Sequence, residues 1–298
     1  MTNPLLSIII PTHNRPQLVI RAVKSALEQT MEDLEVIVVD DASQVTPELP
    51  QDSRVRMIRL PQPSGGAAAR NVGTKAACSR WITYLDDDDR LLPHMAKVSL
   101  KALSEKTKSP VAVISGLEVV DAQGKISHKR IPPKLRKQGN HFFLEELEPG
   151  YSYNTKQTLV VERKVIEQIG GWDETFRSRV HSELFLRLNP ACSIIGLPVM
   201  TYQLTAHEGA RVSRDVQLRQ ESFQRLIGKH KSLFKAHSQM FAHFVYDQAI
   251  MSQKLNQHSA AISNLLWAMQ INPVYTCKRL ARPTYYRIFK RFPVEYTL

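Results

Sequence analysis

Short apolar runs alternate with helical segments over the first 115 residues, and this alternation restricts the fold more than any other feature. The runs LSIII at 6–10 and VIVV at 36–39 are rich in β-branched residues, as in strands buried on both faces. Between them, apolar residues recur at helical spacing from Pro16 to Gln29. Further strands are expected at 55–60, 81–85 and 111–114, and further helices at 66–79 and 93–104. Because such alternation builds right-handed βαβ units, we predict an α/β fold with a mostly parallel sheet flanked by helices.

Two clusters of carboxylates directly follow predicted strands. Asp40 and Asp41 come after 36–39, and the run Asp86, Asp87, Asp88 and Asp89 comes after 81–85. Ligands of parallel sheets bind outside the carboxyl ends of the strands, so both clusters should lie at that edge. Four adjacent carboxylates exceed what a helix cap needs, and their oxygens suit the Mg²⁺ or Mn²⁺ that bridges a diphosphate. We therefore predict a metal–diphosphate site, with a solvated turn capped by Asp89 as the alternative.

The pair Asp40 and Asp41 allows two interpretations. Either carboxylate can accept hydrogen bonds from a nucleobase imide or a ribose hydroxyl, or it can simply cap the loop. The nearby stretch GGAAARN at 65–71 matches neither the dinucleotide fingerprint nor the P-loop. Its small residues allow a helix to pack closely beneath a ligand, and Arg70 is placed to pair with a phosphate or with the acidic run.

The net charge of +12 indicates an anionic partner, which can be a nucleotide, a nucleic acid or an anionic lipid. The basic residues are dispersed and no aromatic-rich recognition motif accompanies them, so we do not expect nucleic-acid binding. Three distant cysteines and an N-terminus without a basic signal region favour a cytoplasmic protein, with peripheral contact at the inner face of the membrane as an option. No apolar run is long enough to span a bilayer.

Beyond Ser115 the alternation weakens. The basic, proline-interrupted segment 125–137 is predicted to be an exposed loop, and from about 216 the pattern is helical almost to the end. We therefore divide the chain into a domain at 1–215 and a C-terminal α-helical appendage at 216–298. The segment CKRLARPTYYRIFKRF mixes basic and aromatic residues, which suits either an anionic bilayer surface or an ordinary amphipathic helix packed on the core.

Four motifs occur in order and at natural spacing: SIIIPTHNRPQLVIRAVKSALEQT, EVIVVDDAS, GGAAARNVGTKAA and WITYLDDDD. Together they resemble the nucleotide-binding half of family 2 glycosyltransferases with the GT-A fold. The resemblance continues through TLVVERKVIEQIGGWDETF and covers roughly residues 5–190. It implies a metal-dependent, inverting glycosyltransferase that uses a nucleoside diphosphate sugar. The acceptor would be a saccharide or glycolipid, as in the synthesis of surface polysaccharides or glycoconjugates.

The resemblance also implies roles for individual residues. In the donor pocket, Asp41 would contact the base with support from Asp40, and the other donor-binding positions would be Pro11, Thr12, Arg70 and Asp86. The divalent cation, Mn²⁺ or Mg²⁺, would be bound by Asp86 and Asp88, with a late histidine, His207, reaching the metal or the diphosphate. The turn Gly171, Trp172 and Asp173 would border the acceptor pocket.

One position departs from the family pattern. The family usually places Glu-Asp after the G-G-[FW]-D-E-x-F turn, and that aspartate is the general base, whereas this chain has Val180 and His181 there. His181, whose ordinary pKa is about 6.5, and Glu183 are the two candidates to replace it. The alternative is a catalytically impaired protein that binds nucleotide-sugar through a GT-A domain.

Overall fold

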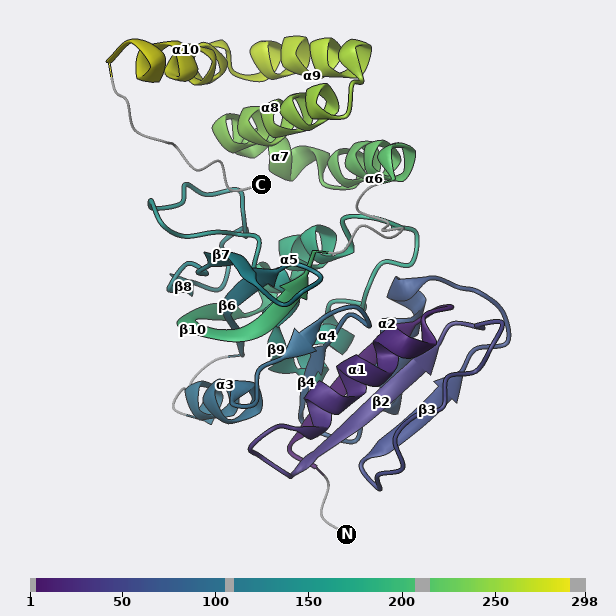
Figure 1. Ribbon diagram of the computed structural model, residues 1–298. Helices are drawn as coiled ribbons and strands as arrows, with labels where there is room; N and C mark the ends of the chain where they lie inside the picture. The colour runs from purple at the N-terminus through teal and green to yellow at the C-terminus, as the bar shows by residue number, and fades with distance from the viewer. Residues whose placement is uncertain (1–3, 105–109, 207–214, 290–298) are drawn as a thin grey trace. The chain divides into compact units, whose positions relative to one another are not determined.

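The computed structural model describes residues 4–104, 110–206 and 215–289 of the chain (Figure 1). In the N-terminal part, the predicted alternation is present. Its strands are β1 (Leu6–Thr12), β2 (Leu34–Asp40), β3 (Val55–Arg59), β4 (Trp81–Tyr84), β5 (Arg90–Leu91) and β6 (Val111–Val120). Its helices are α1 (Pro16–Leu27), α2 (Gly66–Ala76) and α3 (Met95–Ser104).

The strands of the described residues form one mixed sheet. After β6 come β7 (Ile126–Arg130), β8 (Leu135–Arg136), β9 (Val160–Glu162) and β10 (Ser193–Thr205). The order is β3-β2-β1-β4-β9-β6-β10-β5, with β7 paired to β6 and β8 paired to β10. Neighbours from β3 to β4 are parallel, as is the pair β6–β10, whereas β9 runs antiparallel to both β4 and β6. The carboxyl ends of β1, β2 and β4 therefore meet at one edge of the sheet.

Helices α1 and α2 cover opposite faces of the parallel strands (Figure 1). Pro16 begins α1, where a missing backbone N–H costs nothing. The buried face of this helix, which includes Val19 and Val23, joins Ile8 and Ile10 of β1 in the main core. Because side chains alternate along a strand, Ile9 points the other way, toward Gly73 of α2. Burial on both faces explains why β1 is apolar without alternation.

Two features between residues 120 and 205 differ from expectation. The prediction of an exposed loop at 125–137 was wrong, because β7 and β8 lie within it as antiparallel additions to the sheet. The long strand β10 was not predicted at all. Its burial is irregular and its register against β6 shifts twice, so it lacks the period-two pattern that marks a strand in sequence.

The middle of the chain also contains η1 (Lys156–Thr158), α4 (Arg163–Gln168) and α5 (Val180–Ala191). The C-terminal helices are α6 (Val216–Lys229), α7 (Lys231–Ala236), α8 (Ser238–Lys254), α9 (His258–Ile271) and α10 (Pro273–Phe289). Contacts divide the chain into one compact unit of Met1–Phe142 with Leu147–Leu226 and a second of Phe143–Glu146 with Ile227–Leu298. The boundary thus falls inside α6. Among the described residues, no helix has the length and apolar character needed to cross a membrane.

Candidate metal and nucleotide site

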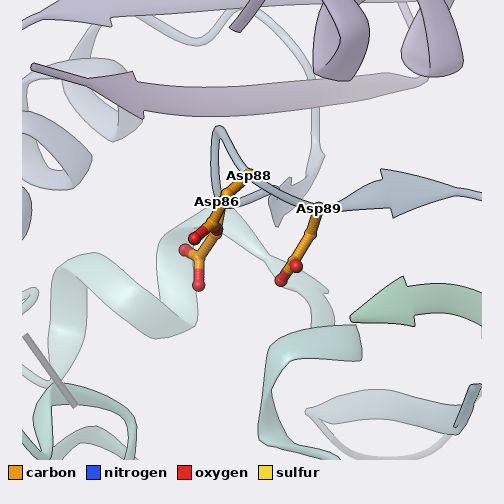
Figure 2. Close-up of side chains that lie close together, drawn as sticks. All are labelled: Asp86, Asp88 and Asp89. Atoms are coloured by element: carbon orange, nitrogen blue, oxygen red, sulfur yellow. The ribbon is translucent and has the colours of Figure 1, made fainter. Parts of the chain in front are cut away.

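Three aspartates gather where β4 ends and β5 begins. One carboxylate oxygen from each of Asp86, Asp88 and Asp89 lies within 4.8 Å of the others. Figure 2 shows the three side chains pointing to the same side of this connection, with the carboxylates of Asp86 and Asp88 next to each other. A set of carboxylate oxygens at this spacing fits a hard divalent cation such as Mg²⁺ or Mn²⁺. These three residues supply only oxygen ligands and no sulfur or nitrogen.

Asp89, expected as a helix cap in the alternative interpretation, is instead part of this cluster. It is buried, and its carboxylate accepts hydrogen bonds from the Tyr202 hydroxyl at 2.8 Å and the Thr205 backbone N–H at 2.9 Å. Burial, together with the charges of Asp86 and Asp88, raises the pKa of Asp89 well above its usual range. The strand β10 therefore fixes the orientation of a residue that belongs to the β4–β5 connection.

Asp87 is not part of that cluster, and its carboxylate contacts Thr12 at the end of β1. This carboxylate accepts a hydrogen bond from the Thr12 hydroxyl at 2.8 Å and forms an ion pair with Arg15 at 3.0 Å. Burial raises the pKa of Asp87 to about 6, although Arg15 and Thr12 oppose this shift. The Thr12 carbonyl also accepts from the Asp41 backbone N–H at 2.9 Å. Thr12 thus connects the two acidic clusters, which do converge at the edge where the strands end.

The carboxylates of Asp40 and Asp41 hold the loops around this edge. Asp41 accepts hydrogen bonds from the backbone N–H groups of Ser64 and Gly65, at 2.7 and 2.8 Å, one on each oxygen. Asp40 is fully buried and accepts from the Ser43 N–H and from Arg59, both at 3.0 Å. Both carboxylates therefore cap backbone N–H groups of the neighbouring loops. Contact with a nucleobase stays a prediction, as does the role of Pro11, which lies buried in β1.

Arg70 connects the acidic cluster to the turn at 171–173. Its guanidinium forms an ion pair with Asp86, donates to the Gly66 carbonyl at 3.0 Å and lies 5.0 Å from the centre of the Trp172 ring. The side chain is 9% exposed, so the charge is held in a medium that screens it poorly. Arg70 is consequently positioned to balance negative charge at Asp86 or on a ligand bound beside it.

The turn that contains Gly171, Trp172 and Asp173 is attached to α2. Asn71 accepts from the Trp172 N–H at 2.8 Å and donates to the Trp172 carbonyl at 2.9 Å. Gly171 has a φ of +71°, and a Cβ there would lie 2.6 Å from Asn71 Oδ1, so the turn requires glycine. Asp173 accepts from the backbone N–H of Thr175 within the same turn. Its proximity to an acceptor stays a prediction.

Trp172 is buried and brings His181 into the site. Its ring makes edge contacts with Tyr84 at 4.8 Å and with the His181 imidazole at 5.0 Å between centres. Burial of the ring lowers the pKa of His181 to about 3, with Asp86 acting in the opposite direction and Arg70 and Lys156 adding to the decrease. His181 is therefore neutral at physiological pH, and its ordinary pKa of about 6.5 does not apply here.

Glu183 is not part of this arrangement. Glu183 is buried in the first turn of α5, and both of its carboxylate oxygens accept hydrogen bonds from Arg187, one of them at 2.7 Å. A carboxylate fixed in this way stabilises α5, whereas His181 contacts Trp172, which also packs against Arg70. Which of the two residues acts as the base stays a prediction. His207 lies outside the described residues.

Sequence reasoning missed several residues that shape the site. Arg15, Asn71 and Tyr202 each contact an important residue through a long-range hydrogen bond or ion pair. Of these three, only Arg15 could have been identified from local sequence, because it follows the first strand at the edge where ligands are expected. The partners of Asn71 and Tyr202 are more than 100 residues away along the chain, and no local pattern reveals such pairs.

Parts of the chain are similar in sequence to proteins that have been named. Succinoglycan biosynthesis protein ExoO of Rhizobium meliloti is 37% identical over 128 residues, which are 41% of this chain and 36% of that protein. A Campylobacter jejuni protein named GalNAc(5)-diNAcBac-PP-undecaprenol beta-1,3-glucosyltransferase is 27% identical over 202 residues, 64% of each chain. The chain thus spans about a third of the length of some of the relatives that it matches.

The fold is similar to that of solved glycosyltransferase structures of the GT-A type. The crystal structure of S. aureus TarS 1-349 in complex with UDP-GlcNAc aligns with a TM-score of 0.64 at 17% identity, over 95% of this chain and 87% of that one. The family model described as glycosyl transferase family 2 matches residues 7–169, which is more than half of the chain. This protein is therefore a member of glycosyl transferase family 2.

Proposed function

We propose that this chain is a metal-dependent glycosyltransferase that moves a sugar, with inversion, from a nucleoside diphosphate donor to a hydroxyl of a saccharide or glycolipid. The observation that carries the proposal is the cluster of Asp86, Asp88 and Asp89 at the carboxyl edge of the sheet in a family 2 chain. The names of two relatives support a product in surface polysaccharide or glycoconjugate synthesis, because they specify succinoglycan and an undecaprenol-linked saccharide.

The donor half of the proposal assigns the diphosphate to the acidic edge. Asp86, Asp88 and Asp89 would hold Mn²⁺ or Mg²⁺, which supplies a Lewis acid for the leaving diphosphate. Arg70, already paired with Asp86, would stabilise the negative charge that develops on the leaving group. Each carboxylate oxygen of Asp41 accepts one backbone hydrogen bond and retains a further lone pair, which would accept a hydrogen bond from a nucleobase imide.

The acceptor half assigns His181 as the general base, next to the turn at 171–173. A neutral imidazole can accept a hydrogen bond from the acceptor hydroxyl as that oxygen attacks the sugar. Contact with Trp172 fixes the plane of the ring, since edge-to-face packing restricts its rotation. The low pKa makes this base weak, so it would orient the hydroxyl and take up its proton late in the reaction.

A panel of nucleoside diphosphate sugars, measured by thermal shift with and without Mn²⁺, tests the donor site. A ligand at ~100 times its dissociation constant stabilises the folded chain by roughly 2.7 kcal/mol. We expect at least one donor to give a Mn²⁺-dependent increase in the melting temperature. Asp88→Asn should abolish the Mn²⁺-dependent part while the ligand-free melting temperature changes little.

Glu28→Gln is the matched control for that panel, because Glu28 is exposed at the end of α1 and belongs to neither acidic cluster. It should keep the full response to donor and Mn²⁺. A parental response in Asp88→Asn would show that the metal site has been assigned to the wrong residues.

A second candidate is a nucleotide-sugar-binding protein that has lost transfer. It is favoured by the absence of the family aspartate and by the pairing of Glu183 with Arg187, which leaves only a weak base. Donor binding in the thermal-shift panel without sugar transfer to any acceptor, and without slow hydrolysis of the donor, would support this candidate over the enzyme.

A further inference from the structure

Helix α9 is an uncharged helix on the surface of the C-terminal unit. Its sequence HSAAISNLLWAMQI contains no Lys, Arg, Asp or Glu. One side, with Ala261, Asn264 and Ala268, is buried, and α9 packs against α8. On the other side, Ile262 and Leu266 are 60% and 59% exposed. These two side chains are four residues apart and therefore share one face of the helix.

Exposed apolar side chains continue from α9 into α10. Val274 in the first turn of α10 is 63% exposed, and Leu280 further along is 43% exposed. The two helices follow each other in the same unit, with α8 alongside (Figure 1). The exposed residues of α9 also include Ser263 and Gln270, so Ile262 and Leu266 lie among uncharged polar side chains. Large apolar side chains exposed on a face without charge mark a candidate interaction surface.

The charge around this surface identifies the kind of partner. Residues 227–298 contain ten Lys and Arg but only two acidic residues, Asp247 and Glu295. Among the described side chains, Lys278 is exposed, whereas Arg279 pairs with Asp247 at 3.6 Å and Glu146 lines a hollow with Val274. The unit as a whole therefore keeps an excess of positive charge. A second copy of the chain would bring two surfaces of the same charge together, which opposes self-association. An anionic bilayer instead attracts the basic residues and accepts the apolar side chains between its headgroups.

We propose that the exposed apolar surface of α9 and the start of α10, formed by Ile262, Leu266 and Val274, docks on an anionic lipid bilayer. The apolar side chains enter the headgroup region, and the exposed Lys278 of α10 contacts lipid phosphates. This attachment is peripheral, and it goes beyond the glycosyl transfer proposed above without resting on it. It differs from the sequence interpretation by placing the contact on the uncharged α9 as well as on the basic segment that follows it.

Vesicle flotation of the full chain tests the proposal without donor or metal. The vesicles are phosphatidylcholine alone, or phosphatidylcholine with phosphatidylglycerol. The parent should float with the anionic vesicles, and much less with neutral vesicles or at high salt. Ile262→Gln with Leu266→Gln should weaken binding about tenfold or more, because two exposed apolar side chains no longer leave water. Lys278→Gln should weaken it by about fivefold, the effect of one surface charge.

The matched control replaces two apolar residues that are similarly exposed in the N-terminal unit. Ile126 and Leu135 are 43% and 50% exposed, and Ile126→Gln with Leu135→Gln should float like the parent. Glutamine is a good helix former, so the α9 variant should keep parental helicity by circular dichroism. Lys278→Gln provides an independent measurement that does not alter α9.

Several results would overturn the docking proposal. The proposal fails if the parent chain does not float with anionic vesicles. It also fails if the parent and the α9 variant are recovered equally. A dimer in analytical ultracentrifugation that Ile262→Gln with Leu266→Gln dissociates would instead identify a second copy as the occupant of this surface.

Discussion

At the scale of single residues, the environment of His181 lowers its pKa, and the sequence alone does not reveal this change. A surface histidine would titrate near pH 6.5, but this ring has a pKa of about 3. The imidazole therefore remains unprotonated at every pH at which activity is usually measured. Asp86 and Arg70, which influence its pKa with opposite signs, are both residues of the proposed donor site.

His181→Ala should lower turnover by about 10²-fold, the lower end of the range for a positioned base, because a base with so low a pKa gives limited help. Donor affinity should change little, and His181→Asp should restore part of the rate. His181 should contribute no acid limb near pH 6.5 to the pH–rate profile, since the imidazole is neutral from pH 5 upward. Any acid limb that arises from Asp87, whose pKa is about 6, should persist in His181→Ala. Initial rates of transfer and donor titrations measure these effects. Parental turnover in His181→Ala would remove His181 from the mechanism.

At the scale of secondary-structure elements, the close approach of α2 to the sheet positions Arg70 and Asn71. Gly73 is the contact point. A Cβ at this position would overlap Ile9 Cγ2 and lie 3.3 Å from Val39 Cγ2. Both neighbours are fully buried strand residues with no room to move aside. Gly73, two residues beyond the GGAAARN motif, therefore allows α2 to pack closely on the sheet, and this packing positions Arg70 near the strand ends.

Gly73→Ala should destabilise the chain by about 1–3 kcal/mol through overpacking, even though alanine is the better helix former by ~1 kcal/mol. The control is Gly228→Ala in α6, where a Cβ meets nothing within 4 Å and the substitution should be neutral or slightly stabilising. Urea denaturation of both variants measures the difference. Equal stability of Gly73→Ala and the parent would mean that α2 can shift away from β1 without cost.

At the scale of the whole molecule, the excess of positive charge is distributed between two different environments. In the C-terminal unit, residues 227–298 contain ten Lys and Arg against two acidic residues, and among them Lys278 is exposed. In the N-terminal unit, by contrast, Lys156 is buried and donates to the Tyr153 carbonyl at 2.8 Å. Burial, with further contributions from Arg179 and Arg130, lowers the pKa of Lys156 to about 7.

This buried lysine should make the stability of the folded chain depend on pH. Between pH 7 and 9 the unfolded chain keeps the Lys156 proton while the folded chain loses it, so the free energy of unfolding rises with pH. The increase can reach roughly 1.4 kcal/mol per pH unit. Lys156→Met should remove this dependence, which urea denaturation of parent and variant at pH 7, 8 and 9 measures. If the free energy of unfolding changed equally with pH in the parent and in Lys156→Met, Lys156 would not be the source of the pH dependence.

Local pattern was enough to predict the N-terminal α/β alternation, the acidic edge and the family. These features depend on periodicity and on residues adjacent in sequence. The apolar run LSIII favours a buried strand, Asp40 is the last residue of β2, and Asp86 comes two residues after β4. The helical C-terminal region was also predicted, since its pattern is local too.

Only the tertiary structure decided how the candidate site is assembled. The position of Asp89 depends on Tyr202, and that of Trp172 depends on Asn71, through contacts between residues more than 100 positions apart. The strands β7, β8 and β10 form because neighbouring strands complete their hydrogen bonds, and not because their own sequences alternate. The low pKa of His181 likewise arises from burial, a property of the packed molecule that no single segment contains.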